Sequence, residues 1–139
     1  MTDVRPATAA DAEAVIALWT VCGLTRPWND PGADFDLALK TTSATVLVAV
    51  AADGMAGAVM VGFDGHRGWV YYLAVDPAAR RGGLGRALMQ AAEVWLVEQG
   101  APKLQLMVRA DNAEALAFHE ALGLEVQPVT VLGRRLDGP

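Results

Sequence analysis

The sequence predicts a mixed α+β fold, with a mostly antiparallel sheet that is flanked by about four helices. Apolar and β-branched runs at residues 45–51, 56–63 and 69–75 follow one another across short turns, which is the pattern of an antiparallel meander. A periodic helical segment then separates the third run from a further strand-like run at residues 103–108. Because a strand, a crossover helix and a strand in succession normally lie parallel, we expect one parallel pair within the sheet.

The N-terminal part is expected to hold a short strand and a helix. Residues 3–6 are the candidate strand. Thr8 and Asp11 have the spacing of a capping box, and an apolar stripe at helical spacing follows them. Gly23 is a typical residue to end that helix.

Turn residues divide the middle of the chain. Residues 24–31 are expected to form a loop before a weaker helix at residues 34–40. Asp53-Gly54 is a hairpin signal between the first two apolar strands. Residues 64–68 are expected to turn the chain into the third strand.

The next helix is expected to carry Leu84, Ala87, Leu88, Ala91 and Trp95 on one face and to stop at Gly100. After the strand at residues 103–108, residues 113–122 are expected to form a helix that Gly123 closes. Residues 126–136 are expected to be terminal strand material, with a break near Pro128.

Length and composition limit the possible functions. The chain has 139 residues, which favours a single domain over residues 1–139. Its net charge of −5 argues against a nucleic-acid partner, and the turn at Asp53-Gly54 argues against a membrane span in the most apolar region. One cysteine, Cys22, builds neither a disulfide nor a zinc site, so we expect a cytoplasmic protein without a metal.

Glycines and arginines gather between the third apolar strand and the helix that carries Leu84 and Trp95. Glycines let backbone N–H groups approach an anion closely, and a helix N-terminus adds unpaired N–H groups, so a diphosphate fits such a loop. The alternative is an ordinary glycine-rich turn with solvated arginines. The candidate anion-binding residues are Arg80, Arg81, Gly82, Gly83, Leu84, Gly85 and Arg86.

Two motifs carry a resemblance to a known family. Arg80-x-x-Gly83-x-Gly85 resembles the Arg/Gln-x-x-Gly-x-Gly/Ala signature of the GNAT superfamily of acetyl-CoA-dependent N-acyltransferases. The segment Asn112-x-x-Ala115-x-x-Phe118-His119-x-x-x-Gly123-Leu124 resembles the superfamily's Asn-x-x-Ala-x-x-Leu-Tyr-x-x-x-Gly-Phe segment. The resemblance covers residues 69–124, and residues 26–31 and 64–68 look like the small bacterial YpeA-type branch.

The resemblance implies a co-substrate, acetyl-CoA, and a way of holding it. The third strand would splay from its parallel neighbour, and the backbone of Leu73, Ala74 and Val75 would pair with the pantetheine amides. The N–H of Leu73 would polarise the thioester carbonyl, and the amides of residues 81–86 would bind the pyrophosphate. Asn112 would contact the cofactor arm or cap its own helix.

Direct attack of an amine on the thioester needs a neutral nucleophile, an oxyanion site and a proton for the departing thiolate. His119 stands where the superfamily commonly has a tyrosine, so it is a candidate proton donor. For removal of the amine's proton, the third strand offers no carboxylate, and Tyr71 and Tyr72 are its polar candidates; strand alternation predicts that they face opposite sides of the sheet. Asp64 and His66 are candidates for removing the amine's proton through water. Cys22 is expected to be a packing residue.

The acceptor is expected to enter beside the first loop between helices. Trp28, Asn29, Asp30 and Asp34 would offer an aromatic wall and carboxylates to a primary ammonium. A small-molecule amine, a peptide N-terminus and a protein lysine all fit, and so do a monomer and a homodimer. Two alternatives to the enzyme are a non-catalytic acyl-CoA-binding module and an interaction subunit whose glycine loop is structural.

Overall fold

The computed structural model describes residues 3–138 and contains a five-stranded sheet in the order β1-β2-β3-β4-β5. Neighbouring strands are antiparallel except for β4 and β5, which are parallel. This arrangement confirms the predicted fold class. The strands are β1 (Val4–Pro6), β2 (Ala44–Ala51), β3 (Gly54–Phe63), β4 (Gly68–Val75) and β5 (Leu104–Leu106).

The α-helices lie close to their predicted positions. They are α1 (Ala12–Val21), α2 (Pro31–Lys40), α3 (Leu84–Gln99) and α4 (Ala113–Ala121). Within residues 3–138, none of the helices has the length and apolar character that a bilayer crossing requires. The chain divides into two compact units. The first ends at Met107 and holds the sheet with α1, α2 and α3, and the second begins at Val108 and holds α4.

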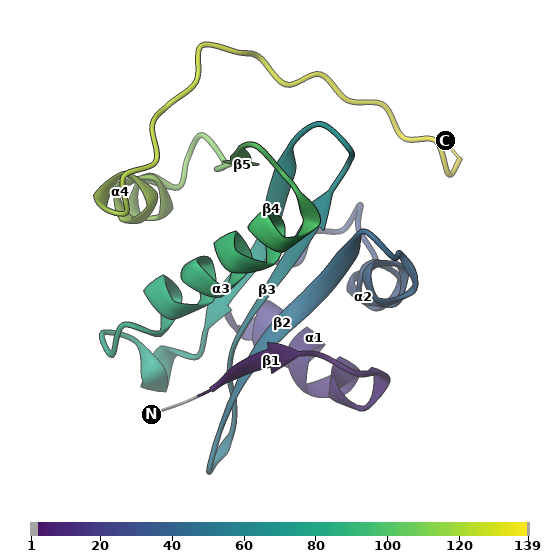
Figure 1. The fold of residues 1–139 in the computed structure, drawn as a ribbon. Coiled ribbons are helices and arrows are strands. Elements are labelled where there is room, and N and C mark those ends of the chain that lie inside the picture. The colour runs from purple at the N-terminus through teal and green to yellow at the C-terminus, as the bar shows by residue number, and fades with distance from the viewer. Residues whose placement is uncertain (1–2, 139) are drawn as a thin grey trace. The chain divides into compact units, whose positions relative to one another are not determined.

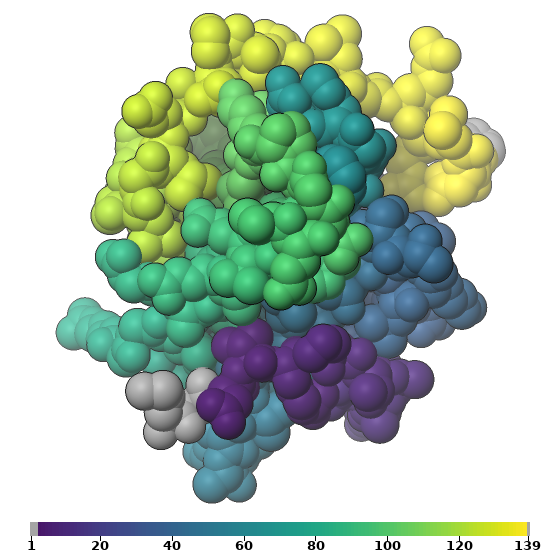
Figure 2. Space-filling view, in the orientation of Figure 1, coloured from purple at the N-terminus to yellow at the C-terminus, as the bar shows by residue number. Residues whose placement is uncertain are grey.

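Helices cover both faces of the sheet in the first unit. α1 and α2 contribute Trp19 and Phe35 to the core on one face, where both side chains are fully buried and their rings meet edge to face. α3 packs on the opposite face (Figure 1). The space-filling view shows α3 covering the strands from that side (Figure 2).

Glycines in β3 and β4 let α3 approach the sheet closely. A Cβ atom at Gly68 would lie 2.6 Å from both terminal carbons of Leu96, and one at Gly57 would lie 2.7 Å from Leu88 Cδ1. Both leucine side chains are buried. Because these distances are shorter than van der Waals contact, the position of α3 depends on the missing side chains.

We predict that Gly68→Ala lowers the free energy of unfolding by about 1–3 kcal/mol, since the new methyl group overpacks the contact with Leu96. Gly62→Ala is the matched control, because its Cβ would meet Ala44 at an ordinary 3.4 Å. Urea unfolding measures both variants. Equal stabilities for the two variants would contradict the close approach of α3.

The first helix ends as predicted. Gly23 has a φ of 72°, and its N–H donates to the Thr20 carbonyl while that of Leu24 donates to the Trp19 carbonyl. This pair of hydrogen bonds is the Schellman motif, which needs a residue in the left-handed region. α3 and α4 end in the same pattern at Gly100 and Gly123, so all three predicted helix stops are confirmed.

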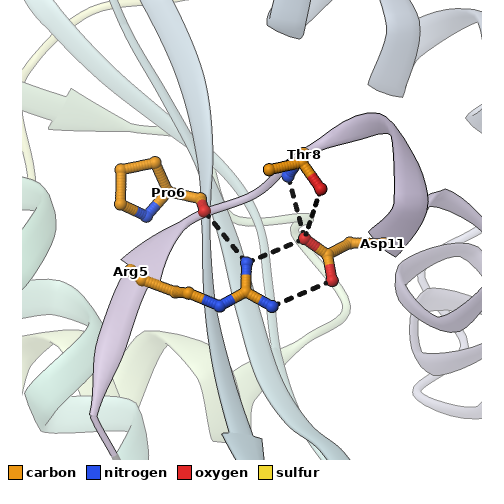
Figure 3. A network of polar contacts seen from close by, with 4 residues as sticks. All are labelled: Arg5, Pro6, Thr8 and Asp11. Carbon is orange, nitrogen blue, oxygen red and sulfur yellow. Dashed lines mark hydrogen bonds and ion pairs between the residues drawn. The ribbon is translucent and has the colours of Figure 1, made fainter.

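An ion pair fixes the entry to α1 (Figure 3). The Asp11 carboxylate accepts hydrogen bonds from both terminal nitrogens of Arg5, at 2.9 and 3.0 Å, and from the Thr8 N–H at 2.8 Å. The hydrogen bond from Arg5 has the largest effect and that from Thr8 the next, and together they lower the pKa of Asp11 to about 2. The Thr8 and Asp11 spacing therefore does head a helix, although a short 3₁₀ turn, Ala9–Asp11, comes before α1.

The lowered pKa predicts a pH-dependent loss of stability. A carboxyl whose pKa is lower in the folded state than its unfolded value of about 4 stabilises the fold above that value and stops doing so as the pH falls through its folded pKa. We expect Asp11→Asn to cost about 0.5–1 kcal/mol at neutral pH, after solvent screening, and the difference from wild type to vanish between pH 4 and 2. A difference that stays constant down to pH 2 would contradict this account.

Three predicted boundaries need correction. α2 begins at Pro31 and not at residue 34, because Asp30 accepts from the Ala33 N–H as an N-cap and proline suits the first helical position. β5 is shorter than the predicted strand at residues 103–108. The terminal strand expected at residues 126–136 is wrong, since no strand follows α4 within the described residues.

The local chain explains the missing terminal strand. The N–H of Val129 donates to the carbonyl of Gln127 across Pro128, which turns the chain instead of extending it. The apolar side chains beyond this turn do not form a buried face: Leu132 is 86% exposed and Leu136 is 93% exposed. The apolar composition of this segment therefore does not produce a strand.

Candidate active site

A β-bulge interrupts β4 at its two tyrosines. Met60 of β3 faces Tyr71, but Ala58 faces Ala74, so the single residue Val59 lies opposite two residues of β4. Tyr72 has a φ of 55°, which is uncommon for a residue with a side chain. The bulge thus gives β4 one extra residue.

The extra residue places both tyrosines on one face of the sheet. Tyr71 and Tyr72 line the same pocket, and the Tyr72 ring stacks on Trp19 of α1 with the ring centres 4.0 Å apart. The prediction that the two side chains face opposite sides is therefore wrong. Simple alternation fails here because it assumes a regular strand.

The bulge lies where β4 and β5 separate. Their parallel pairing ends at Val70 and Leu106, whereas β4 continues to Val75. The Asp76 N–H donates to the Ala56 carbonyl of β3. Because N–H groups alternate in direction along a strand, those of Leu73 and Val75 point away from β3, toward the edge of β4 that β5 no longer pairs with. This open edge is suited to an extended ligand that carries amides.

The glycine-rich turn follows this edge. Arg81 and Gly83 have φ values of 73° and 82°, and α3 starts at Leu84. The N–H groups of the first helical turn, from Leu84 to Arg86, have no carbonyl of a preceding turn to bind. The turn therefore presents unpaired donors at the positive end of the helix dipole, which is an arrangement that favours a phosphate.

The three arginines of the turn differ in their surroundings. Arg80 is directed back to the end of β4: its Nε donates to the Val75 carbonyl at 3.3 Å, and Nη2 lies 3.8 Å from Cys22 Sγ. Arg81 and Arg86 are exposed. Cys22 is half-buried and also donates to the Val75 carbonyl, at 3.3 Å, which agrees with its predicted packing role.

A pocket of about 390 Å³ lies on the face of the sheet that α2 covers. It brings together four residues that the sequence indicated, from the first loop, from α2 and from the bulge. The remaining lining residues come from α2 and from the strands β2 and β3. The lining residues are Asn29, Asp34, Leu37, Ala38, Thr41, Ala44, Met60, Val61, Gly62, Tyr71 and Tyr72.

The two tyrosine hydroxyls have different environments. The Tyr72 hydroxyl donates to Asp34 Oδ2 at 2.7 Å, and burial followed by this carboxylate raises the pKa of Tyr72. Burial, and then the charge of Asp64, raises the pKa of Tyr71. Because its pKa is raised, the Tyr71 hydroxyl keeps its proton at neutral pH. Within residues 3–138 it makes no hydrogen bond, so it can offer that proton to a ligand.

Asp64 is occupied by the turn between β3 and β4. Its Oδ1 accepts from the N–H groups of His66 and Arg67, at 2.8 and 2.7 Å, and its Oδ2 accepts from the Trp69 indole at 3.1 Å. The hydrogen bond from the Arg67 N–H, and to a smaller extent that from the His66 N–H, holds the pKa of Asp64 below its usual range. The His66 ring lies 3.4 Å from the Arg67 guanidinium, and neither Asp64 nor His66 lines the pocket.

The second unit contains the remaining candidates. Asn112 Oδ1 accepts from the Ala115 N–H at 3.0 Å and therefore caps α4. His119 is buried beside Phe118, and its Nδ1 makes no hydrogen bond among the described residues. Burial lowers the pKa of His119, so its ring is uncharged at neutral pH and gives up a proton less readily than an imidazolium.

The first loop places its candidates differently. Asn29 and Asp34 line the pocket, whereas Asp30 caps α2 and Trp28 is largely exposed. The apolar wall of the pocket was not predicted from the sequence. Leu37 and Ala38 follow Asp34 by three and four residues, a spacing that places them on the same side of a helix and could have indicated this wall.

Comparison with known proteins yields a family and a fold. The model of the Acetyltransferase (GNAT) family matches residues 12–124. An acetyltransferase of Yersinia enterocolitica is 42% identical over 134 residues, which are 96% of this chain and 95% of that protein. An acetyltransferase of Sodalis glossinidius is 43% identical over 135 residues, with the same coverage.

Solved structures share the fold at lower identity. The aminoglycoside N-acetyltransferase AAC(6')-Iy in complex with CoA superposes with a TM-score of 0.83 at 19% identity, over 98% of this chain and 95% of that one. An aminoglycoside acetyltransferase from a soil metagenome, in complex with sisomicin, has a TM-score of 0.77 at 18% identity and covers 96% of both chains.

Proposed function

Because this chain belongs to the Acetyltransferase (GNAT) family, we propose that it transfers an acetyl group from acetyl-CoA to a primary amine by direct attack. The observation that carries the proposal is one stretch of chain, in which the bulge, the open edge of β4 and the glycine-rich turn follow one another. The pocket that holds both tyrosines lies beside the bulge.

The coenzyme would bind mainly through the backbone. Its pyrophosphate would accept hydrogen bonds from the amides between Arg81 and Arg86, and the exposed side chains of those two arginines would reach its phosphates. Its pantetheine amides would pair with Leu73, Ala74 and Val75 along the open edge. A structural neighbour of this chain was solved with CoA, which supports this choice of ligand.

The acetyl group would then lie near the bulge. The amine nitrogen forms a bond to the carbonyl carbon, and the negative charge that develops on the carbonyl oxygen is stabilised by the N–H of Leu73. The C–S bond then breaks, the thiolate of CoA takes up a proton, and the amine nitrogen releases one. No acyl-enzyme is needed, in agreement with the packing role of Cys22.

Among the candidates, Tyr71 is the proton donor that we favour. Tyr71 lines the pocket, and its hydroxyl holds its proton at neutral pH and makes no hydrogen bond within residues 3–138. Tyr72 is less suited because its proton is already donated to Asp34. His119 is the second candidate, and its uncharged ring makes it the weaker acid.

The pocket would bind the acceptor. Asp34 would receive the ammonium through Oδ1, the oxygen that Tyr72 does not contact, with Asn29 beside it. Asp64 is a poor acceptor for the amine's proton because three hydrogen bonds hold its carboxylate. His66 stays a candidate for that role through water. Trp28 and Asp30, at the loop, and Asn112, at its helix cap, are the outlying candidates for ligand contact.

Release of free thiol from acetyl-CoA, followed over a panel of primary amines, tests this proposal. We expect release that depends on both the protein and an amine, together with an acetylated amine in the mass spectrum. Thiol release that never exceeds the rate without protein, across simple alkylamines, amino acids, polyamines and lysine peptides, would contradict the proposed function.

A further inference from the structure

The pocket beside the bulge, taken as the acceptor pocket, has few charged side chains for its volume. Asp34 is the one charged side chain among its lining residues, which all lie within residues 3–138. Most of the other lining side chains are apolar, and they come from α2, β2 and β3. The apolar members are Leu37, Ala38, Ala44, Met60 and Val61.

The nearby carboxylates already accept hydrogen bonds from other residues. Asp30 accepts from the Ala33 N–H at the start of α2, and Asp64 accepts three hydrogen bonds in the β3–β4 turn. The Asp34 carboxylate accepts one hydrogen bond, from Tyr72 at Oδ2, and its Oδ1 accepts none from the described residues. The pocket therefore offers one carboxylate oxygen to a cation.

This arrangement favours one ammonium over several. A second ammonium that entered the pocket would leave water without a counter-charge, which is unfavourable. An apolar chain would instead gain binding free energy from each methylene group that it buries. The tyrosine rings at the bulge add a favourable surface for one cation.

We propose that the acceptor is a primary amine with a single ammonium group and an apolar chain or ring, rather than a polyamine or an aminoglycoside. The inference rests on the proposed function, because it takes this pocket as the acceptor site. The ammonium would bind at Asp34 and Tyr71, and the apolar part would lie against Leu37, Ala38 and Met60.

Two amines of the same length test the proposal. Hexylamine and hexamethylenediamine share a six-carbon chain, and the diamine adds an ammonium at the far end. We expect kcat/KM for hexylamine to exceed that for the diamine by about tenfold or more, because a difference of about 1.4 kcal/mol is tenfold. Titration calorimetry in the presence of CoA measures the binding of the same two amines.

A variant of Leu37 tests the same idea from the protein side. Leu37 is 66% exposed, so a polar side chain is tolerated there. Leu37→Glu adds a second carboxylate to the pocket, and Leu37→Gln is the control of equal size without the charge. We expect the preference for hexylamine over the diamine to fall by about threefold to tenfold in Leu37→Glu relative to Leu37→Gln.

The outcomes separate this inference from the proposed function. Acetylation of the diamine as efficiently as hexylamine overturns the inference and leaves the proposed function intact. Tighter binding of hexylamine without acetylation of either amine supports the pocket's preference for a single ammonium and overturns its assignment as the acceptor site. An absence of both binding and acetylation for the two amines overturns the inference, and the wider amine panel then decides the proposed function.

Discussion

Replacing Gly83 with valine is expected to weaken CoA binding by about 10- to 100-fold. Gly83 precedes α3 with a φ of 82° and a ψ of 9°, a conformation that costs a β-branched residue more than the 1–2 kcal/mol typical of side chains in the left-handed region. The turn must then rearrange, and the amides of Leu84 to Arg86 lose their common direction. Losing one or two hydrogen bonds to a charged phosphate, at about 1.5–3 kcal/mol each, accounts for the expected effect.

The matched control lies at the other end of the same helix. Gly100 has a φ of 88° and a ψ of 14°, and a Cβ atom meets nothing within 4 Å at either glycine. Gly100→Val therefore imposes the same backbone strain on α3 away from the proposed phosphate site. Calorimetric titration with CoA should show a change of less than about threefold in this variant. Equal losses of affinity in the two variants would mean that helix stability, and not the turn, controls binding.

Replacing Tyr71 with phenylalanine is expected to lower kcat by about 100-fold or more, in the range typical of general acid catalysis, with little change in KM for acetyl-CoA. The variant keeps the ring, which packs near Trp69 with the ring centres 6.5 Å apart. It removes the hydroxyl that would give the thiolate its proton. Steady-state kinetics with a saturating amine provide the measurement.

Two further variants distinguish the candidate donors. Tyr72→Phe removes the hydrogen bond to Asp34, so we expect a higher KM for the amine and a smaller loss of kcat. His119→Phe is expected to leave kcat within about threefold of wild type. A 100-fold loss in His119→Phe with normal turnover in Tyr71→Phe would transfer the proton-donor role to His119.

The pH profile adds an independent test of Tyr71. Because burial raises its pKa, the hydroxyl keeps its proton up to and above the usual tyrosine value of about 10. Loss of a required tyrosine proton would therefore reduce kcat only above about pH 10. A decline of kcat on the alkaline side between pH 7 and 9, absent from Tyr71→Phe, would contradict this role.

The sequence predicted most elements because their local patterns are strong. The apolar stripe from Leu84 to Trp95 defines α3, and glycines at the ends of α1, α3 and α4 adopt the expected left-handed conformation. The crossover from β4 through α3 to β5 required a parallel pair, which the structure contains. The prediction of a terminal strand at residues 126–136 was wrong because an apolar composition does not by itself provide a partner strand.

The bulge in β4 could not be predicted from the sequence. Neither Tyr71 nor Tyr72 is a residue that signals a positive φ, and the conformation of Tyr72 is held by tertiary contacts with Trp19 and Asp34. The loop and α2 residues Asn29 and Asp34 were indicated from the sequence, and both line the pocket. Their position beside both tyrosines depends on how α2 packs on the sheet.

Membership of the family also bears on the alternatives to an enzyme. Relatives named acetyltransferases match 96% of the chain, which favours an acetyltransferase over a non-catalytic acyl-CoA-binding module or an interaction subunit. The co-substrate acetyl-CoA and the amine acceptor are the parts that the proposed experiments decide.

A crystal structure of the protein with CoA tests the account most directly. We predict that the pyrophosphate lies within hydrogen-bond distance of the amides of Leu84, Gly85 and Arg86, and that the pantetheine arm runs beside Leu73, Ala74 and Val75. Bound CoA whose pyrophosphate contacts neither the turn nor the start of α3, or whose arm leaves the edge of β4 empty, would contradict the account.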